Sequence, residues 1–537
     1  MTRKIVAILV VAILCLAAVG AAQPGSASPT YPAGSSRPRF LTASNGRFVD
    51  TYGRQVILHG ANLVNKSKAS GYIGDERPQD FARMADWGFN CLRLGVIWDG
   101  LEPEPGRFNE DYLRKIDEQI GWARRHELCV FLDMHQDLFS SKYSDGAPTW
   151  ATLDEGLPHV AKGEVWSDAY FTSPAVQRAF DNFWANAPAP DGVGVQDHFA
   201  RAWAHVARRY ADDPAVIGYD LMNEPFEGTV GAQAYGRVIA KLAEVLAARE
   251  GGAATPEAVM ARLAAPDGRR DLIQALGDIA FFQQLTDLVE PASREFERAK
   301  LMPMYRRVAS AIRELDPHHI LFLETGIFAN AGTRSAIEPL MDPDGKPDPL
   351  QAYAPHGYDI GTDTSDVAAA NNQRVELIFA RHAETAQRLG LPMLVGEWGA
   401  YYNSPHAYPA ARFASSQFER HLASDTYWSY TKDLANAAYL PALARPYPME
   451  ISGTLVSYSA DFDALKFTAV WKEDPAISAP TRIYLPKAIF SKRHRIKLLP
   501  KGIGYKFEFS GREGNQYLII PPTGRAVERH LTTYPAS

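Results

Sequence analysis

Between Val56 and Tyr430 the sequence alternates eight short apolar runs, each typical of a buried strand, with amphipathic helical patterns. The strand-like runs are VILHGANL (56–63), FNCLRLGVIW (89–98), CVFLDMH (129–135), IGYDLMNE (217–224), ILFLET (320–325), QAYAPHGY (351–358), MLVGEWG (393–399) and TYWSY (426–430). Strands that alternate with helices favour a parallel sheet, and eight such units predict a closed (β/α)8 barrel. An open doubly wound sheet is the alternative, but no glycine-rich phosphate loop follows the first run.

The pattern changes after about Pro441. Strand-like runs such as LKFTAVWKE (465–473) and TRIYLP (481–486) follow one another, separated by Gly, Pro, Ser and Asp. We therefore expect an α/β barrel domain over 39–440 and an antiparallel β-sandwich over 441–537. An Ala-rich helical insertion at about 231–300 interrupts the barrel pattern. It is a cap over the substrate cleft, a lipid-contacting surface, or a set of helices packed on the barrel, and we favour the last.

The N-terminus has the features of a secretory signal. A basic start and a short apolar core precede Gly20-Ala21-Ala22, which predicts a signal peptide over 1–22, a flexible linker over 23–38 and a secreted protein. Cys91 and Cys129 both lie in apolar runs, so buried free thiols are favoured over a disulfide. The net charge of -6 is not gathered in a basic stripe, which argues against nucleic acid as a partner. A monomer is expected.

Polar side chains follow the strand-like runs at the point where each run ends. They are Asn62, Arg93, His135, Asp137, Asn223, Glu224, His356, Tyr358, Glu397 and Trp428. In a barrel these ends share one face, where active sites are built. The clustering therefore predicts one catalytic site at that face.

Two glutamates within this set predict the chemistry. Asn223-Glu224-Pro225 ends the fourth run, and Glu397 ends the seventh. Cleavage of a glycosidic bond needs one carboxylic acid to protonate the leaving oxygen and a second carboxylate near the anomeric carbon. A single glutamate at a strand end is more often a salt-bridge partner. The pair at strands four and seven favours glycoside hydrolysis.

With these motifs the sequence resembles glycoside hydrolase family 5, whose retaining barrels carry catalytic glutamates on strands four and seven. The resemblance implies that Glu224 is the acid/base and Glu397 the nucleophile, with their carboxyl groups about 5 Å apart. Because Glu224 must be protonated when cleavage begins, we expect burial and the neighbouring Glu397 to raise the pKa of Glu224.

The same resemblance implies roles for residues around the nucleophile. Arg93 would hold Glu397 and favour its ionised form. Tyr358, paired with His356 after strand six, would donate a hydrogen bond to Glu397. Asn223 would contact the 2-hydroxyl of the sugar.

On the sugar side, His135 resembles the sugar-binding histidine of the family, and Trp428 would be the stacking platform. The run His135-Gln136-Asp137 also suggests metal ligands, but further ligands are missing from the sequence pattern and the chemistry needs none. We therefore predict no metal and no cofactor.

Longer segments resemble the bacterial endoglycoceramidases, which hydrolyse the bond between oligosaccharide and ceramide in glycosphingolipids. They are DMHQDLFS (133–140), GAPTWAT (146–152), AFDNFWAN (179–186), YDLMNEPF (219–226), RPYP (445–448) and APTRIYLP (479–486). The resemblance implies that Asp137 and a lysine after the first strand contact the sugar next to the cleaved one. Lys66 and Lys68 are the candidates, and Lys68 has the better spacing from Asn62.

A glycosphingolipid partner, met at membrane or micelle surfaces, also needs an apolar groove for its ceramide. Trp150, Trp166, Phe171 and Trp184 are candidates to line it, although Trp184 fits the barrel core better. Related enzymes act on simple glycosylceramides, sterol glucosides, or β-glucan and mannan polysaccharides, and these substrates are the alternatives. A catalytically inactive carbohydrate- or lipid-binding barrel is disfavoured because both glutamates are present.

Overall fold

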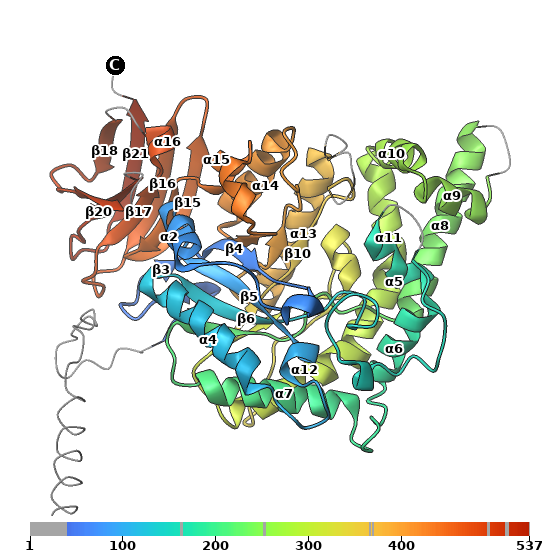
Figure 1. Ribbon diagram of the computed structural model, residues 1–537. Helices are drawn as coiled ribbons and strands as arrows, with labels where there is room; N and C mark the ends of the chain where they lie inside the picture. The colour runs from blue at the N-terminus through green and yellow to red at the C-terminus, as the bar shows by residue number, and fades with distance from the viewer. Residues whose placement is uncertain are drawn as a thin grey trace, which may run out of the picture. The chain divides into compact units, whose positions relative to one another are not determined.

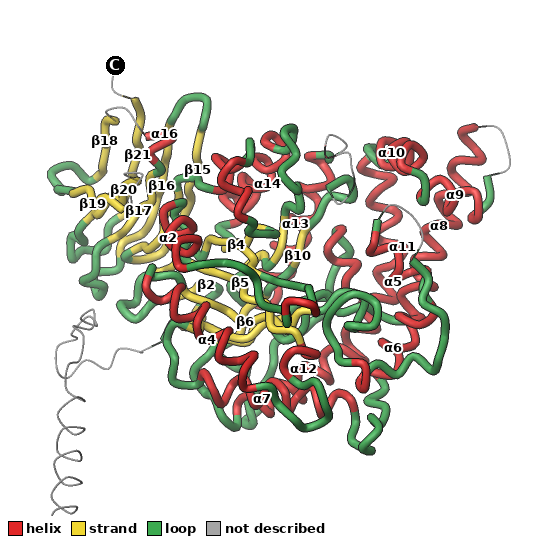
Figure 2. Tube along the Cα trace, in the orientation of Figure 1, coloured by secondary structure: helices red, strands yellow, loops and turns green. Residues whose placement is uncertain are grey.

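The computed structural model describes residues 40–535 except 162–164, 251–253, 363, 365–366, 368–369, 491–493 and 511–514 (Figures 1 and 2). The predicted signal peptide and the whole of the predicted linker lie outside this range. Within it, no helix combines the length and the apolar character that crossing a membrane requires. The described residues belong to a single compact unit, in which α14 (Tyr408–His421) of the barrel domain contacts β15 (Gly453–Asp461) of the C-terminal part.

Eight parallel strands form the barrel, as the alternation predicted. Their order is β11 (Leu394–Val395), β13 (Ser424–Tyr427), β4 (His59–Leu63), β5 (Cys91–Ile97), β6 (Cys129–His135), β7 (Val216–Asp220), β8 (Ile320–Leu323) and β9 (Gln351–Tyr353). A parallel bridge between Tyr353 and Met393 joins the two ends of this order and closes the ring. Beyond it, β10 (His356–Gly357) pairs with β12 (Glu397–Trp398), which sets His356 opposite Glu397.

Helices follow the barrel strands along the chain. They are α2 (Pro78–Asp86), α3 (Trp98–Leu101), α4 (Glu110–Arg125), α5 (Ala169–Thr172), α6 (Pro174–Trp184), α7 (Val195–Tyr210), α12 (Met302–Arg313), α13 (Asn372–Leu389), α14 (Tyr408–His421) and α15 (Leu440–Leu443). Short 3-10 turns η3 (Trp166–Asp168) and η5 (Ile327–Ala331) lie in two loops that reach the site described below. The helical patterns thus alternate with the strands as expected.

The insertion consists of α8 (Thr229–Glu250), α9 (Pro256–Leu263), α10 (Pro266–Ala275) and α11 (Ile279–Phe296), followed by a π-helical turn at Glu297–Leu301. In Figure 1 these helices form a neighbouring group, and α8 packs against α9 and α11 while α9 packs against α10. Leu242, Leu246, Leu272 and Leu285 share their apolar core. The insertion therefore has a core of its own.

The C-terminal part is an antiparallel β-sandwich, as predicted. Its first sheet has the order β1 (Thr42–Ser44), β2 (Arg47–Val49), β3 (Gln55–Val56), β14 (Tyr447–Ile451), β17 (Thr481–Leu485), β20 (Asn515–Ile520) and β19 (Lys506–Ser510). The second has the order β15 (Gly453–Asp461), β16 (Lys466–Glu473), β21 (Glu528–Pro535) and β18 (His494–Leu499). Ile483 from one sheet and Trp471 from the other share one buried core.

Residues 42–56 differ from the prediction, which assigned everything from 39 to 440 to the barrel domain. β3 pairs with β14, so the N-terminal strands extend the C-terminal sheet. Phe48 and Val56 also pack with Phe131 and Phe322, which are buried side chains of barrel strands. The N-terminal strands therefore connect the sandwich to the barrel core.

Candidate active site

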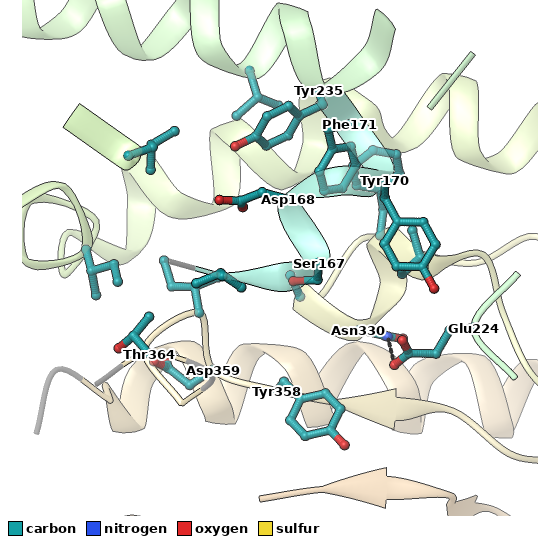
Figure 3. Close-up of a pocket in the computed structure, with 18 of the residues that line it drawn as sticks. Ser167, Asp168, Tyr170, Phe171, Glu224, Tyr235, Asn330, Tyr358, Asp359 and Thr364 are labelled. Carbon is teal, nitrogen blue, oxygen red and sulfur yellow. Dashed lines mark hydrogen bonds between the residues drawn. The ribbon is translucent and has the colours of Figure 1, made fainter. Parts of the chain in front are cut away.

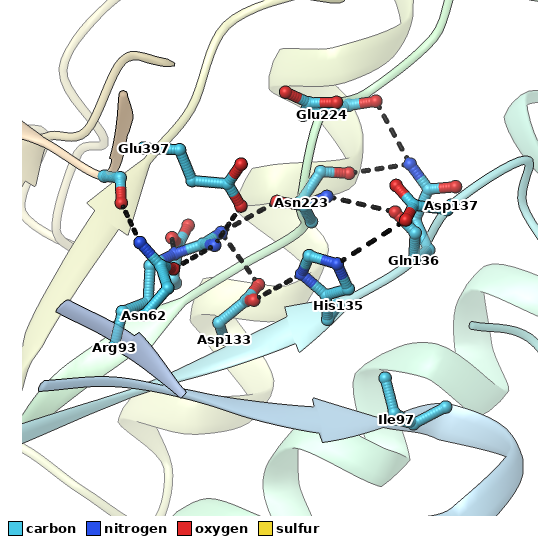
Figure 4. Close-up of polar contacts among 12 residues, drawn as sticks. Asn62, Arg93, Ile97, Asp133, His135, Gln136, Asp137, Asn223, Glu224 and Glu397 are labelled. Carbon is cyan, nitrogen blue, oxygen red and sulfur yellow. Dashed lines mark hydrogen bonds and ion pairs between the residues drawn. The ribbon is translucent and has the colours of Figure 1, made fainter. Parts of the chain in front are cut away.

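Glu397 lies at the carboxyl end of the barrel strands and is held from two sides (Figure 4). Arg93 donates from Nη1 to Glu397 Oε1 at 2.6 Å, and the Tyr358 hydroxyl donates to Oε2 at 2.7 Å. Both contacts were expected from the sequence. Together they orient one carboxylate with a cation on one oxygen and a neutral donor on the other.

Arg93 sits on β5, fully buried, at the centre of a group of acids. Besides Glu397 it contacts Asp133 at 2.9 Å, Asp220 at 2.8 Å and Glu324 at 2.7 Å. A buried charge is tolerated only when it is paired in this way. Burial raises the pKa of Asp133 to about 7, of Asp220 to about 6 and of Glu324 to about 7, against the opposing charge of Arg93. The cluster therefore holds part of its acid in the neutral form near pH 7.

Glu224 faces the nucleophile from the loop after β7. Its Oε1 accepts a hydrogen bond from Asn330 Nδ2 at 2.7 Å and lies 3.0 Å from His356 Nδ1. Its backbone N–H donates to Glu324 Oε2 at 2.8 Å, which fixes a residue whose φ of 42° lies in the left-handed region. Asn223 accepts from Arg93 Nη2 at 2.9 Å and also donates to the Gln136 carbonyl at 3.0 Å.

The protonation of Glu224 differs from the expectation. Burial raises the pKa of Glu224, but the hydrogen bond from His356 and the charges of His356 and Lys66 outweigh burial and bring that pKa below its usual value. Burial lowers the pKa of His356, yet the charges of Glu324 and Glu397 hold it well above its usual range. The prediction of a raised pKa for Glu224 was wrong because it did not include the buried cation beside the carboxylate.

The spacing of the two carboxylates is decisive for the type of displacement. One oxygen of Glu224, one of Glu397 and one ring nitrogen of His356 all lie within 4.8 Å of one another. Retaining glycosidases place their carboxyl groups about 5–5.5 Å apart, whereas inverting ones leave about 6.5–9.5 Å for a water molecule. The geometry fits a direct nucleophilic attack by one carboxylate.

A second polar group borders the glutamates. Lys66 forms an ion pair with Asp137, and its Nζ lies 4.4 Å from the centre of the Trp428 ring. The His135 ring stacks on Trp428 with centroids 5.2 Å apart, while its Nδ1 is 2.7 Å from Asp133. Burial and the charge of Lys66 lower the pKa of His135 to about 3, so its imidazole is neutral. Its Nε2 is buried, has no hydrogen-bond partner among the described residues and lies 3.9 Å from Asp137 Oδ2.

Lys68 does not belong to this group, contrary to the preference drawn from its spacing. Its side chain is 63% exposed and pairs with Asp99 at 2.8 Å. It borders a separate hollow together with Trp150. Of the two candidate lysines, the structure places Lys66 at the glutamates.

A cavity of about 410 Å³ contains both glutamates (Figure 3). Its polar part is lined by Lys66, His135, Asp137, Glu224, Tyr358, Glu397 and Trp428. Its apolar part is lined largely by the insertion, through Val238, Ile239, Leu242, Leu272, Ile273, Leu285 and Val289. The insertion therefore lines the cleft, and its helices α8 and α11 also pack on the barrel helices α6 and α13, so it has features both of the expected cap and of the expected packed helices.

The four aromatic residues proposed for the apolar groove divide into two pairs. Trp166, which is 42% exposed, and Phe171 line the cavity. Trp150 instead donates from Nε1 to the Glu102 carbonyl at 3.1 Å, in the separate hollow. Trp184 donates to the Phe226 carbonyl at 2.8 Å and packs in the barrel core, as favoured.

Four residues of the site were absent from the sequence-based prediction. Asp133, Asp220 and Glu324 are single acidic residues within or directly after apolar strand runs. An acidic residue in such a run is a sequence signal that could have identified them as site residues. Asn330 lies in the 3-10 turn η5, where no sequence pattern marks it. Cys91 and Cys129 lie opposite each other on β5 and β6 as free thiols, as favoured, but only Cys91 is fully buried and Cys129 is partly exposed.

Comparison with known proteins places the chain among glycoside hydrolases. Residues 49–262 and 278–434 match the family model "Cellulase (glycosyl hydrolase family 5)", and residues 445–531 match the "Glycoside hydrolase family 5 C-terminal domain". An endoglycoceramidase of Cyanea nozakii is 34% identical over 213 residues, which is 34% of this chain and 41% of that protein. Endoglycoceramidase I of Rhodococcus hoagii is 33% identical over 191 residues, 35% of this chain and 37% of that protein. The chain thus matches about two fifths of the length of these curated relatives.

A solved structure aligns over much more of the molecule. Endo-glycoceramidase II from Rhodococcus sp., determined as a lactosyl-enzyme intermediate, superposes with a TM-score of 0.68 at 27% identity, covering 93% of this chain and all of that one. The same protein in complex with ganglioside GM3 superposes with a TM-score of 0.69. The likeness therefore extends over both the barrel and the sandwich.

Proposed function

The chain belongs to glycosyl hydrolase family 5, and from this premise we propose that it hydrolyses the β-glycosidic bond between oligosaccharide and ceramide in glycosphingolipids, releasing both intact. One observation carries the proposal: a single cavity joins the carboxylate pair to an apolar part. A glycolipid needs both, because its sugar requires polar groups and each buried methylene of its aglycone contributes about 0.8 kcal/mol. The relatives named endoglycoceramidase support the same substrate class.

The reaction proceeds in two steps with Glu397 as nucleophile. The carboxylate of Glu397, oriented by Arg93 and Tyr358, attacks the anomeric carbon. Glu224 takes the proton that it shares with His356 and transfers it to the glycosidic oxygen. The bond between that carbon and the oxygen breaks, and ceramide leaves as an alcohol. The sugar is then held as an ester of Glu397.

In the second step Glu224 acts as a base instead of an acid. Its carboxylate now accepts a proton from water, and the water oxygen attacks the anomeric carbon and displaces Glu397. The glycan leaves with its original anomeric configuration. Trp428, His135 and the Lys66–Asp137 pair line the cavity beside the glutamates, where they can position the sugar.

A polysaccharide substrate is the main rival within the family. An extended glucan or mannan would gain little from the apolar residues of the insertion, whereas a lipid chain would be desolvated by them. Simple glycosylceramides and sterol glucosides also carry apolar aglycones, and they remain alternatives for the sugar that is accepted.

The experiment is product analysis by mass spectrometry after incubation with a mixed glycosphingolipid panel, with carboxymethylcellulose tested in parallel. We expect intact oligosaccharides together with free ceramide, and no comparable rate on the polysaccharide. Glu397→Gln should bind the glycolipid but release no product. Release of single sugars only, or turnover confined to carboxymethylcellulose, would contradict the proposal.

We also propose that the protein is secreted and meets its substrate as a monomer at membrane or micelle surfaces. The sequence of residues 1–22 supports secretion. Expression of the full chain, with N-terminal sequencing of the protein recovered from the medium, tests this. A mature N-terminus near Gln23 is the expected result, and retention of Met1 in the cells would contradict it.

A further inference from the structure

One segment of the insertion lies outside the family model yet lines the cavity. The matched regions end at residue 262 and resume at 278, and the interval holds α10. Leu263, Arg269, Leu272, Ile273 and Leu276 from this interval all border the cavity. The part of the barrel domain that departs from its family thus supplies a wall of the site.

The N-terminal half of α10 is tied to the rim of the cavity. Arg269 forms an ion pair with Asp168 of η3, and the two side chains are only 11% and 19% exposed. Arg269 Nε also donates to the Leu263 carbonyl at 2.8 Å. Because the pair is largely shielded from water, it is screened less than a surface ion pair.

The C-terminal end of α10 is tied to the barrel. Arg374 of α13, which is 1% exposed, donates from Nη1 to the carbonyls of Ile273 at 3.2 Å and Leu276 at 3.1 Å. The same guanidinium donates to both carboxylate oxygens of Asp359, from Nε to Oδ2 at 2.7 Å and from Nη2 to Oδ1 at 2.9 Å. Asp359 follows Tyr358, the residue that donates to the nucleophile. The N-terminal half of α10 is thus anchored to Asp168, which borders the cavity, and its C-terminal end to Arg374, which binds Asp359 of the cavity lining.

We propose that residues 263–277 form a fixed wall against which the hydrocarbon chain of the aglycone packs, so that this segment determines how aglycone length affects the reaction. The inference rests on the proposed glycolipid substrate. Ile273 is the residue we assign to this contact, since its side chain is buried and lines the cavity, and its carbonyl is held by Arg374. A chain too short to reach α10 would gain nothing from it, whereas a longer one would bury its distal methylenes there.

The experiment compares kcat/KM for a series of lactosides whose aglycone grows from methyl to dodecyl, together with lactosylceramide in detergent micelles. For the wild-type protein, kcat/KM should rise by up to about fourfold for each methylene that becomes fully buried. Ile273→Trp should end this rise at a shorter chain. Ile273→Ala should lower the ratio of kcat/KM for dodecyl over methyl lactoside by about tenfold.

Gln274→Trp is the matched control, because Gln274 is the exposed neighbour of Ile273 on the same helix. It should reproduce the wild-type profile along the series. If both Ile273 variants also follow the wild-type profile, the role of α10 is overturned while the proposed function stands. If the wild-type protein cleaves methyl lactoside, shows no gain with chain length and leaves lactosylceramide intact, both the inference and the proposed function are overturned.

Discussion

At the scale of single residues, the proton of the acid/base is shared between two buried groups. His356 Nδ1 lies 3.0 Å from Glu224 Oε1, and the two pKa shifts leave the proton on the histidine in the free protein. Catalysis requires that proton on Glu224. The pair is therefore the unit that titrates, and its apparent pKa belongs to both residues.

The pH profile of kcat/KM tests this sharing. The alkaline limb reports loss of the proton from the pair, so it should lie above 6.5, the ordinary pKa of histidine, because the pKa of His356 is raised. In His356→Gln the proton is held by Glu224 alone, and the limb should move to lower pH by about one unit or more. A limb that stays in place, or moves to higher pH, would contradict the shared proton.

Tyr358→Phe gives a matched comparison that changes the nucleophile instead of the acid. It removes one hydrogen bond of 2.7 Å to a carboxylate. A hydrogen bond to a charged group contributes about 1.5–3 kcal/mol, so kcat/KM should fall by about 10- to 100-fold. The alkaline limb should not move, because His356 and Glu224 keep their contact. An unchanged rate would show that this hydrogen bond does not support the reaction.

The sequence predicted the site where a residue type and a strand end coincided. Arg93, Tyr358 and both glutamates were placed in the site on that basis, and the contacts with Glu397 that the family resemblance implied are present. The protonation state of Glu224 was not predictable, because it depends on contact with His356, which lies 132 positions away along the chain. The choice between Lys66 and Lys68 failed for a related reason, since spacing along a loop does not fix which side chain turns inward.

At the scale of elements, Glu227 connects the catalytic loop to the insertion. It lies three residues after Glu224, is 3% exposed, and accepts from Ser293 of α11 at 2.9 Å. Its second oxygen has no hydrogen-bond partner among the described residues. Burial raises the pKa of Glu227 to about 8, so the carboxyl is neutral at pH 7.

This raised pKa predicts a pH dependence of stability. In the unfolded chain Glu227 ionises near pH 4.5, whereas in the folded chain it keeps its proton up to about pH 8, so its contribution to stability falls across that window as pH rises. Glu227→Gln removes this ionisation. The free energy of unfolding of the variant minus that of the wild type should therefore be larger at pH 7 than at pH 4 by on the order of 3 kcal/mol. The Tm difference between variant and wild type should therefore grow from pH 4 to pH 8. A constant difference would contradict the buried neutral carboxyl.

At the scale of the whole molecule, the N-terminal strands link the sandwich to the barrel. β3 pairs with β14, which lies almost four hundred positions later in the chain. The ring of Phe48 packs on that of Phe322 in the barrel interior, with ring centroids 6.2 Å apart. The local pattern predicted all eight barrel strands and the β-character of the C-terminal part, because alternation and apolar runs are local. It could not assign residues 42–56 to a sheet, since strand pairing at long range leaves no local signal.

Phe48→Ala tests this connection. The side chain is 2% exposed, and its removal leaves a cavity between the strands and the barrel. Truncation of a buried phenylalanine costs about 3–5 kcal/mol, so Tm should fall by about 3–5 °C in a unit of this size. Tyr505→Ala, at a residue that is 44% exposed, should leave Tm nearly unchanged. Equal small shifts in the two variants would show that the N-terminal strands do not support the fold.

The central claim is that Glu397 forms a covalent ester with the sugar, and trapping that ester tests it most directly. In Glu224→Ala, a lactosyl donor with an activated leaving group can still react with Glu397, while the loss of the base slows hydrolysis of the ester. Intact-protein mass spectrometry should show one added lactosyl group, located by peptide mapping on the segment that contains Glu397. No adduct, or an adduct on any other residue, would contradict the assignment.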